Sequence, residues 1–228
     1  MIHALLAVLF PVSCIGCEKV LLDQETHICL NCELELPVTN YQNETNNPLA
    51  KTFWGRVKFE FAFAYLVYKK AGLVKRIVQA IKYKGNKQLA YDFGQRLGRQ
   101  IKLQIHQNGV NALIAVPLHP KRLKQRGFNQ SELIVQGIAS VTHIQNKSEY
   151  IKRTVHTPTQ TAKSRIERWE NVLSIYEVDK QLFQQNGQCH FLLVDDVVTT
   201  GATVESLAKE LLKMGNCKLS VAALAFAP

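Results

Sequence analysis

The sequence lacks an uninterrupted apolar run of the roughly 20 residues that a membrane-spanning helix needs. Its apolar opening, Met1–Pro11, is shorter, and it has neither the basic start nor the small-residue cleavage site of a secretory signal peptide. The chain also contains no internal repeat and no low-complexity tract. From these absences we expect a soluble, cytoplasmic protein with no transmembrane segment.

Acidic residues are scarce relative to basic ones. The 228 residues include 18 Asp and Glu against 28 Lys and Arg, which gives a formal net charge of +10. This balance suits partners that carry phosphate, either small ligands or nucleic acid, although charge alone equally fits a generic basic surface. Apolar residues make up 46% of the chain, so long disorder is not expected.

Cysteine occurs at only six positions. Four of these form two C-x-x-C pairs near the N-terminus: Cys14, Cys17, Cys29 and Cys32. Two such pairs present four thiolates to one tetrahedral Zn²⁺, and a closed ligand set of this kind is structural. Disulfides are the alternative, which the missing secretion signal disfavours. The isolated Cys189 and Cys217 each border an expected strand and are read as small buried hydrophobes.

The order of expected elements indicates the fold class. Residues 1–36 hold the cysteine pairs, residues 37–58 are rich in Asn and Thr and read as a linker, and residues 59–228 form the main domain. In that domain the patterns predict strands at 59–68, 112–116, 190–194 and 219–226, separated by helices at 74–81, 89–105, 133–141 and 203–212. Such alternation predicts a doubly wound, mostly parallel α/β sheet. Asn129 is expected to cap a helix, and Gly215 to end one in a left-handed turn.

Ligands of doubly wound sheets bind beyond the carboxyl ends of the strands. The strand that ends at Val194 is followed by Asp195, Asp196, Val197, Val198, Thr199, Thr200, Gly201, Ala202 and Thr203. We expect the two carboxylates at an exposed strand end, where they can accept hydrogen bonds from a diol. The Thr- and Gly-containing turn and the helix start that follow favour a phosphate. The sequence therefore predicts a ribose 5-phosphate site, the alternative being an ordinary strand–turn–helix.

Two further segments belong to the expected site. Lys121, Arg122 and Arg126 follow the strand that ends at Val116, and their cations can neutralise a departing pyrophosphate. The alternative is a solvated basic loop. A polar segment from Arg153 to Asn171 contains Thr159, Gln160 and Arg165, and it is read either as a loop that closes over a ligand or as an ordinary surface excursion.

Taken together, these motifs resemble one family. Phe191–Thr203 matches the thirteen positions of the phosphoribosyl-pyrophosphate (PRPP) signature of type I phosphoribosyltransferases. Combined with the double C-x-x-C, the runs Pro117–Arg122, Arg126–Gln130 and Thr157–Gln160 make nearly the whole chain similar to the competence protein F (ComF) family. The resemblance implies the type I phosphoribosyltransferase fold, in which Asp195 and Asp196 are the catalytic pair that holds the ribose hydroxyls. Thr199–Thr203 would hold the 5′-phosphate, and Mg²⁺ would bind with the pyrophosphate.

The resemblance also implies a role in natural transformation, beside single-stranded DNA and a helicase-like ATPase. Purine-salvage relatives carry an acidic residue where this chain has Thr199, so hypoxanthine or guanine salvage is disfavoured. Three classes of function stay open at this point: an enzyme that transfers ribose 5-phosphate to an unknown acceptor, a nucleic-acid-binding module, and a scaffold whose zinc module docks a partner. For nucleic acid, the cations of Lys69–Lys87 and Lys121–Arg126 are the candidates, with Tyr68, Tyr83 and Phe128 to stack on bases.

Overall fold

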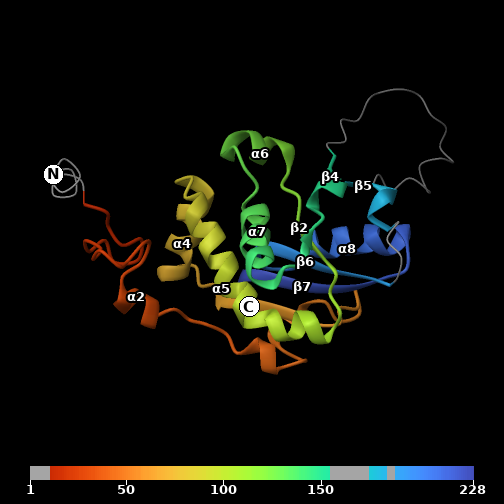
Figure 1. The fold of residues 1–228 in the computed structure, drawn as a ribbon, viewed down its shortest axis with the longest axis horizontal. Helices are drawn as coiled ribbons and strands as arrows, with labels where there is room; N and C mark the ends of the chain where they lie inside the picture. Colours follow the sequence, from red (N-terminus) through yellow and green to blue (C-terminus); the bar gives the residue numbers. More distant parts are fainter. Residues whose placement is uncertain (1–10, 155–174, 184–187) are drawn as a thin grey trace.

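The computed structural model describes residues 11–154, 175–183 and 188–228 (Figure 1). Its main sheet has five strands in the order β1-β7-β6-β2-β3, and every neighbouring pair is parallel. The strands are β1 Ala62–Val67, β2 Ala112–Ala115, β3 Gln145–Asn146, β6 Cys189–Val198 and β7 Cys217–Phe226. A separate antiparallel pair consists of β4 Ile151–Arg153 and β5 Tyr176–Val178.

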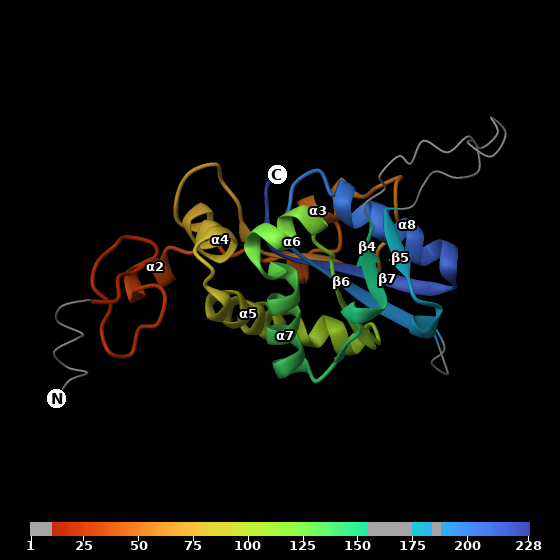
Figure 2. The same ribbon diagram turned by 90° about the horizontal axis from the view of Figure 1, so that it is seen from above.

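Helices cover both faces of the main sheet (Figures 1 and 2). One face packs against α4 Leu73–Tyr83, α5 Lys87–Gln107 and α7 Gln130–Thr142, and the other against α3 Pro48–Thr52 and α8 Ala202–Met214. The short elements are α2 Leu30–Leu34, α6 Pro120–Arg126, η1 Tyr41–Asn43, η2 Ser148–Tyr150 and η3 Lys180–Phe183. The expected doubly wound parallel α/β sheet is confirmed. None of the described helices is long and apolar enough to cross a membrane.

The central strand explains the apolar run in the sequence. Phe191, Leu192, Leu193 and Val194 are all buried because both faces of β6 are covered, so apolar side chains occur at successive positions rather than alternate ones. The strand runs on to Val198, four residues beyond the expected end, because Asp195–Val198 stay in register with β7. The buried positions of Cys189 and Cys217 confirm that they are small core residues.

Residues 37–58, read from sequence as a linker, pack against the sheet. Leu49 and Phe53 are fully buried, and Asn47 caps α3 while its Nδ2 donates to the Ala62 carbonyl at 2.8 Å. Val38 forms an antiparallel bridge with Leu66 of β1. In this segment the polar Asn47 thus caps a helix, and the backbone at Val38 pairs with the edge strand β1. The division of the chain at residues 36 and 58 stays a prediction.

Two local expectations differ from the structure. The basic segment after Pro117, expected as a loop, forms the helix α6, which begins with Pro120 and ends at Gly127 with φ 77°. Proline at the first position and glycine just past the end are helix signals that the charge pattern obscured. Gly215 ends α8 in an extended conformation with φ −179°, not in the expected left-handed one. The expected cap of α7 is confirmed, since Asn129 accepts from the Ser131 N–H.

Candidate functional site

The candidate site lies where β6 ends and α8 begins. Asp195 and Val197–Val204 line a cavity of about 40 Å³ at this point. Because β6 is the central strand, α4 and α7 reach this end of the sheet from one face and the segment after α3 from the other. The aspartates and the turn named from the sequence are therefore brought together with Lys82, Ser131 and Arg56, which it did not indicate for this site.

The two aspartates are not exposed as expected. Asp196 is buried, Asp195 is half-buried, and each already has a partner. Asp195 Oδ1 accepts from Ser131 Oγ at 3.1 Å and from the Asp196 N–H at 2.8 Å. Asp196 Oδ2 lies 3.0 Å from Nζ of Lys82, the penultimate residue of α4. Ligand hydroxyls that bind here must therefore replace or join these protein donors.

The two adjacent carboxylates are electrostatically costly to place side by side. Burial raises the pKa of Asp195 to about 7, and the charge of Asp196 acts in the same direction. The Asp196 N–H, the Lys82 ammonium and the Ser131 hydroxyl oppose this rise in pKa. Near neutral pH Asp195 is consequently divided between its acid and carboxylate forms. Hydrogen-bond donors or a cation from a ligand would stabilise the carboxylate form.

The turn after β6 has the geometry of an anion site. Thr199 and Thr200 are exposed, and Gly201 occupies the N-cap of α8 with φ 73°. Glycine has no side chain to cap the helix, and the Ala202 N–H donates to Thr200 Oγ1 at a long 3.5 Å, so the N–H groups of the next residues of α8 are left for an anion or for water. Nearby, the Tyr176 hydroxyl of β5 donates to the Thr203 carbonyl at 3.4 Å, so the small second sheet lies against the same turn.

The basic residues of α6 lie beside α4 at the same end of the molecule (Figure 2). Lys121 and Arg122 are exposed, whereas Arg126 is half-buried. The guanidinium carbon of Arg126 stands 5.3 Å from the centre of the exposed Tyr83 ring, and its Nη1 donates to Gln130 Oε1 at 2.9 Å. Arg126 is thus held in place, while Lys121 and Arg122 extend from the surface.

The third expected segment is described only in part. Arg153 belongs to β4 and its guanidinium carbon lies 5.7 Å from the centre of the Tyr176 ring. Thr159, Gln160 and Arg165 lie outside the described residues. The expectation that this segment closes over a ligand therefore stays a prediction.

The four N-terminal cysteines form one cluster. Their Sγ atoms all lie within 4.8 Å of one another, and all but Cys17 are buried. The N–H groups of Gly16 and Cys29 donate to Cys14 Sγ at 3.3 and 3.2 Å. Cys17 Sγ lies 3.5 Å from Cys29 Sγ. The spacing seen in the sequence thus produces a four-thiol set that can hold one tetrahedral metal ion.

The acidities of these thiols also fit a cation. Burial raises the pKa of Cys14, but backbone donors, that of Cys29 foremost, outweigh it and lower the pKa to about 6. Burial and the neighbouring thiols raise the pKa of Cys32 instead. Adjacent thiolates repel one another, and a divalent cation would supply the charge that offsets this repulsion.

The cysteine module is attached to the main sheet through helices α4 and α5. The Glu33 carboxylate accepts from Arg96 Nη1 at 2.6 Å, and His27 Nε2 lies 3.0 Å from Asp92 Oδ2. At Gly16 a Cβ atom would come within 2.6 Å of Leu73 in α4. The protein therefore belongs to a class that joins a four-cysteine module to a doubly wound parallel α/β domain.

The relatives of the chain fit this class. The chain is 39% identical over 109 residues to the DNA utilization protein YhgH of Escherichia coli O157:H7, covering 48% of this chain and 46% of that protein. Identity with competence protein F of Haemophilus influenzae is 36% over 116 residues, or 50% and 49% of the two chains. Competence protein ComFC of Bacillus subtilis is 25% identical over 154 residues, or 66% and 58%. The chain thus spans about half the length of the first two relatives, and the resemblance to competence protein F is confirmed. No family model matches the chain.

Two enzymes are among the solved structures that the chain matches, both at a low TM-score. Adenine phosphoribosyltransferase from Saccharomyces cerevisiae has a TM-score of 0.39 and 10% identity, with coverage of 64% of this chain and 71% of that chain. Glutamine PRPP amidotransferase from B. subtilis, complexed with ADP and GMP, has a TM-score of 0.39 and 16% identity, with coverage of 59% and 26%. The interpretation of the site rests on the residues at the end of β6.

Proposed function

We propose that this protein binds PRPP together with Mg²⁺ at the carboxyl end of β6 and acts in DNA uptake. The observation that carries the proposal is the pairing of Asp195 and Asp196 with a glycine-capped helix start that leaves N–H groups for a phosphate. The names of the relatives, competence protein F and DNA utilization protein, support the biological setting.

Each part of the site has a role in this proposal. The two carboxylates accept hydrogen bonds from the ribose hydroxyls, and the exchange moves Lys82 and the Ser131 hydroxyl from their present partners. The turn Thr199–Thr203 binds the 5′-phosphate. Lys121, Arg122 and Arg126 attract the pyrophosphate, and Mg²⁺ neutralises part of its charge when bound with it. In a transfer reaction an acceptor forms a bond to the ribose C1 as the bond to pyrophosphate breaks, and the pair of aspartates holds the sugar.

Calorimetric titration with PRPP and Mg²⁺ tests this proposal. The double substitution Asp195→Asn/Asp196→Asn removes two charged acceptors, each worth about 1.5–3 kcal/mol, and so should weaken binding by roughly a hundredfold or more. Asp92→Asn is the matched control, because Asp92 also accepts side-chain hydrogen bonds but lies in α5. Equal PRPP affinity in the parent and the double variant would show that the assignment of the site is wrong.

We also propose that Cys14, Cys17, Cys29 and Cys32 hold one structural Zn²⁺. The four-thiol geometry supports this choice, because a tetrahedral all-sulfur set suits zinc and leaves no open position for catalysis. In this role the metal ties the two C-x-x-C segments together beneath α4 and α5.

Single-stranded DNA is the second candidate ligand, favoured by the distribution of charge. Residues 12–36 carry five acidic side chains and one basic, a net −4, so residues 37–228 carry +14. The half-buried Arg126 of α6 lies over the exposed Tyr83 ring, and the same short helix carries the exposed Lys121 and Arg122, an arrangement that allows phosphate contacts and base stacking together. Of the three aromatic residues expected to stack, Tyr68 and Phe128 are only half-exposed.

Whether the protein turns PRPP over is decided by its products. Release of pyrophosphate with formation of one modified acceptor in cell extract would identify an enzyme. Salt-dependent DNA binding without pyrophosphate release would identify a nucleic-acid-binding module. Capture of a helicase-like ATPase that survives the Asp195→Asn/Asp196→Asn change, but not loss of the cysteine cluster, would identify a scaffold.

A further inference from the structure

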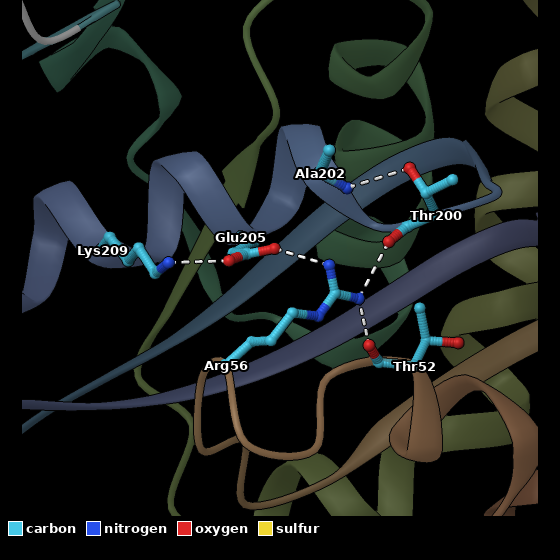
Figure 3. A network of polar contacts seen from close by, with 6 residues as sticks. All are labelled: Thr52, Arg56, Thr200, Ala202, Glu205 and Lys209. Atoms are coloured by element: carbon cyan, nitrogen blue, oxygen red, sulfur yellow. Dashed lines mark hydrogen bonds and ion pairs between the residues drawn. The ribbon is translucent and has the colours of Figure 1, made fainter.

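The turn after β6 is hydrogen-bonded to the segment that follows α3 (Figure 3). Arg56 Nη2 donates to the Thr200 carbonyl at 2.9 Å and also to the Thr52 carbonyl. Its Nη1 donates to Glu205 Oε2 at 2.6 Å, and Glu205 Oε1 in turn accepts from Lys209 Nζ at 2.7 Å. One guanidinium therefore joins α3, the turn and the first part of α8.

The hydrogen bond to Thr200 sets the direction of the next N–H group. A trans peptide is planar, so a carbonyl that points at Arg56 sends the N–H of Gly201 the opposite way. Gly201 itself lies against Phe53, because a Cβ at Gly201 would lie 2.5 Å from the Phe53 ring, and the Arg56 guanidinium carbon stands 5.6 Å from the centre of the same ring. The peptide between Thr200 and Gly201 is thus contacted by two neighbouring residues of the α3 segment.

Simple attraction between charges does not account for this arrangement. The Arg56 and Glu205 side chains are 34% and 16% exposed, and ion pairs with this access to water contribute little to stability. Glu205 also cancels the charge that Arg56 would otherwise offer to an incoming phosphate. What remains specific to Arg56 is the forked contact that reaches a main-chain carbonyl of the turn.

We propose that Arg56 is a positioning residue for phosphate recognition. By holding the Thr200 carbonyl outward, it keeps the Gly201 N–H and the start of α8 arranged for a phosphate before the ligand arrives. This inference rests on the proposed function, and it extends the site to a segment that the sequence indicated only as a linker. The gain is preorganisation: the turn does not have to be ordered when the 5′-phosphate binds.

Three variants test the inference with defined ligands. Arg56→Met removes the hydrogen bonds to the turn, Arg56→Lys retains a single donor for the Thr200 carbonyl, and Lys209→Met removes only the outer ion pair of Glu205. Titrations use PRPP–Mg²⁺, ribose 5-phosphate and pyrophosphate–Mg²⁺. We expect Arg56→Met to weaken PRPP and ribose 5-phosphate by about tenfold, the equivalent of one charge-assisted hydrogen bond. Pyrophosphate, which has no 5′-phosphate, should bind unchanged.

The controls separate positioning from loss of structure. Arg56→Lys should bind PRPP and ribose 5-phosphate more tightly than Arg56→Met but less tightly than the parent. Lys209→Met should bind both ligands as tightly as the parent. Amide hydrogen exchange of the ligand-free protein should quicken in residues 199–203 in Arg56→Met, with the melting temperature close to that of Lys209→Met. If Arg56→Met binds ribose 5-phosphate as tightly as the parent, the inference about Arg56 is wrong. It is also wrong if Arg56→Met loses as much affinity for pyrophosphate as for ribose 5-phosphate, and in either case the proposed function is unaffected. A parent protein that binds neither PRPP nor ribose 5-phosphate overturns the proposed function, and this inference with it.

Discussion

Asp195 is the residue whose chemistry is most altered by the fold. Burial and the neighbouring Asp196 raise its pKa to about 7, compared with an ordinary value of 3.8. When the pKa of a carboxyl group is higher in the folded than in the unfolded state, the free energy of unfolding falls as pH rises, because the unfolded chain ionises first. The loss begins near pH 4 and is complete above the folded pKa, near pH 7. The empty site is therefore least favourable at the pH where a ligand is to be bound.

This leads to a prediction about stability and pH. Asp195→Asn keeps the acceptor for Ser131 but cannot ionise, so the melting temperature of the variant should exceed that of the parent above pH 7. The difference should shrink as pH falls and vanish below about pH 4, the unfolded pKa of Asp. Thermal melts of both proteins in ligand-free buffer from pH 3.5 to 8 measure it. A difference that does not depend on pH would contradict the assigned pKa.

Gly201 shows two separate reasons for a glycine at one position. Its φ of 73° is strained for other residues, and a Cβ would meet the Phe53 ring. Gly55 has a similar φ of 71°, but nothing lies within 4 Å of its Cβ position. The two glycines therefore form a matched pair in which only the steric contact differs.

We predict that Gly201→Ala destabilises the protein more than Gly55→Ala. Both changes incur the backbone penalty of about 1 kcal/mol or more, and only Gly201→Ala must also displace Phe53. Denaturant unfolding measures the free energy of unfolding of each variant. Equal destabilisation by the two substitutions would mean that Phe53 does not constrain the turn.

At the scale of elements, the cysteine module depends on residues close together in sequence. A Cβ at Gly16 would lie 2.5 Å from Cys32 Sγ, so the first C-x-x-C turn closes directly over the second. The module contacts α5 through polar pairs such as Glu33 with Arg96, and its few buried side chains join the apolar cluster of α4 and α5. Such an element has a small apolar core of its own, and a metal is the usual way to stabilise it.

Cys29→Ser should therefore lower zinc from about one ion per chain towards zero and unfold the module, while the α/β sheet stays folded. Cys189→Ala is the matched control, because Cys189 is buried in β6 far from the cluster and should leave the zinc content unchanged. Metal analysis combined with limited proteolysis gives both readouts. Full zinc in a Cys14→Ser/Cys29→Ser double variant would end the assignment of these ligands.

The short helix α6 is an element whose sequence pattern had two readings. Its charge suggested a solvated loop, whereas Pro120 and Gly127 are consistent with the helix that forms. Arg122 and Arg126 are one helical turn apart along the axis, and only Arg126, at the C-terminal end of α6, packs on Tyr83 while Arg122 stays exposed. Two arginines that looked equivalent in the sequence thus differ in surroundings.

At the scale of the whole molecule, charge is divided between the two parts. The cysteine module carries −4 and the rest of the chain +14, so the module repels nucleic acid phosphates and the body attracts them. Figure 2 shows the module at one end of the molecule and α6 over the sheet. Nucleic acid, if it is a ligand, should therefore contact the body and leave the module for other partners.

We predict that the change Lys121→Gln/Arg122→Gln/Lys124→Gln weakens binding of single-stranded DNA. The slope of log affinity against log salt should fall by roughly 0.7 for each DNA phosphate that the variant no longer neutralises. Lys209→Gln/Lys213→Gln removes two cations from α8 that are already paired with Glu205 and Glu210, and it should have little effect. Fluorescence anisotropy at several salt concentrations makes the comparison. Affinity in the parent that does not change with salt would exclude this mode of binding.

The sequence by itself determined four of the five strands of the main sheet, the long helices, the cysteine cluster and the turn after β6, but not the short strands β3, β4 and β5. These features depend on residues that are adjacent or regularly spaced, so hydrophobic period, C-x-x-C spacing and a strand–turn–helix motif are sufficient to predict them. Only the tertiary structure decided which donors meet that turn. Ser131 is 64 residues from Asp195 in the chain, and Arg56 is 144 residues from Thr200. Such partners are selected by strand order and helix packing, and by the burial that raises the pKa of Asp195, none of which a local pattern contains.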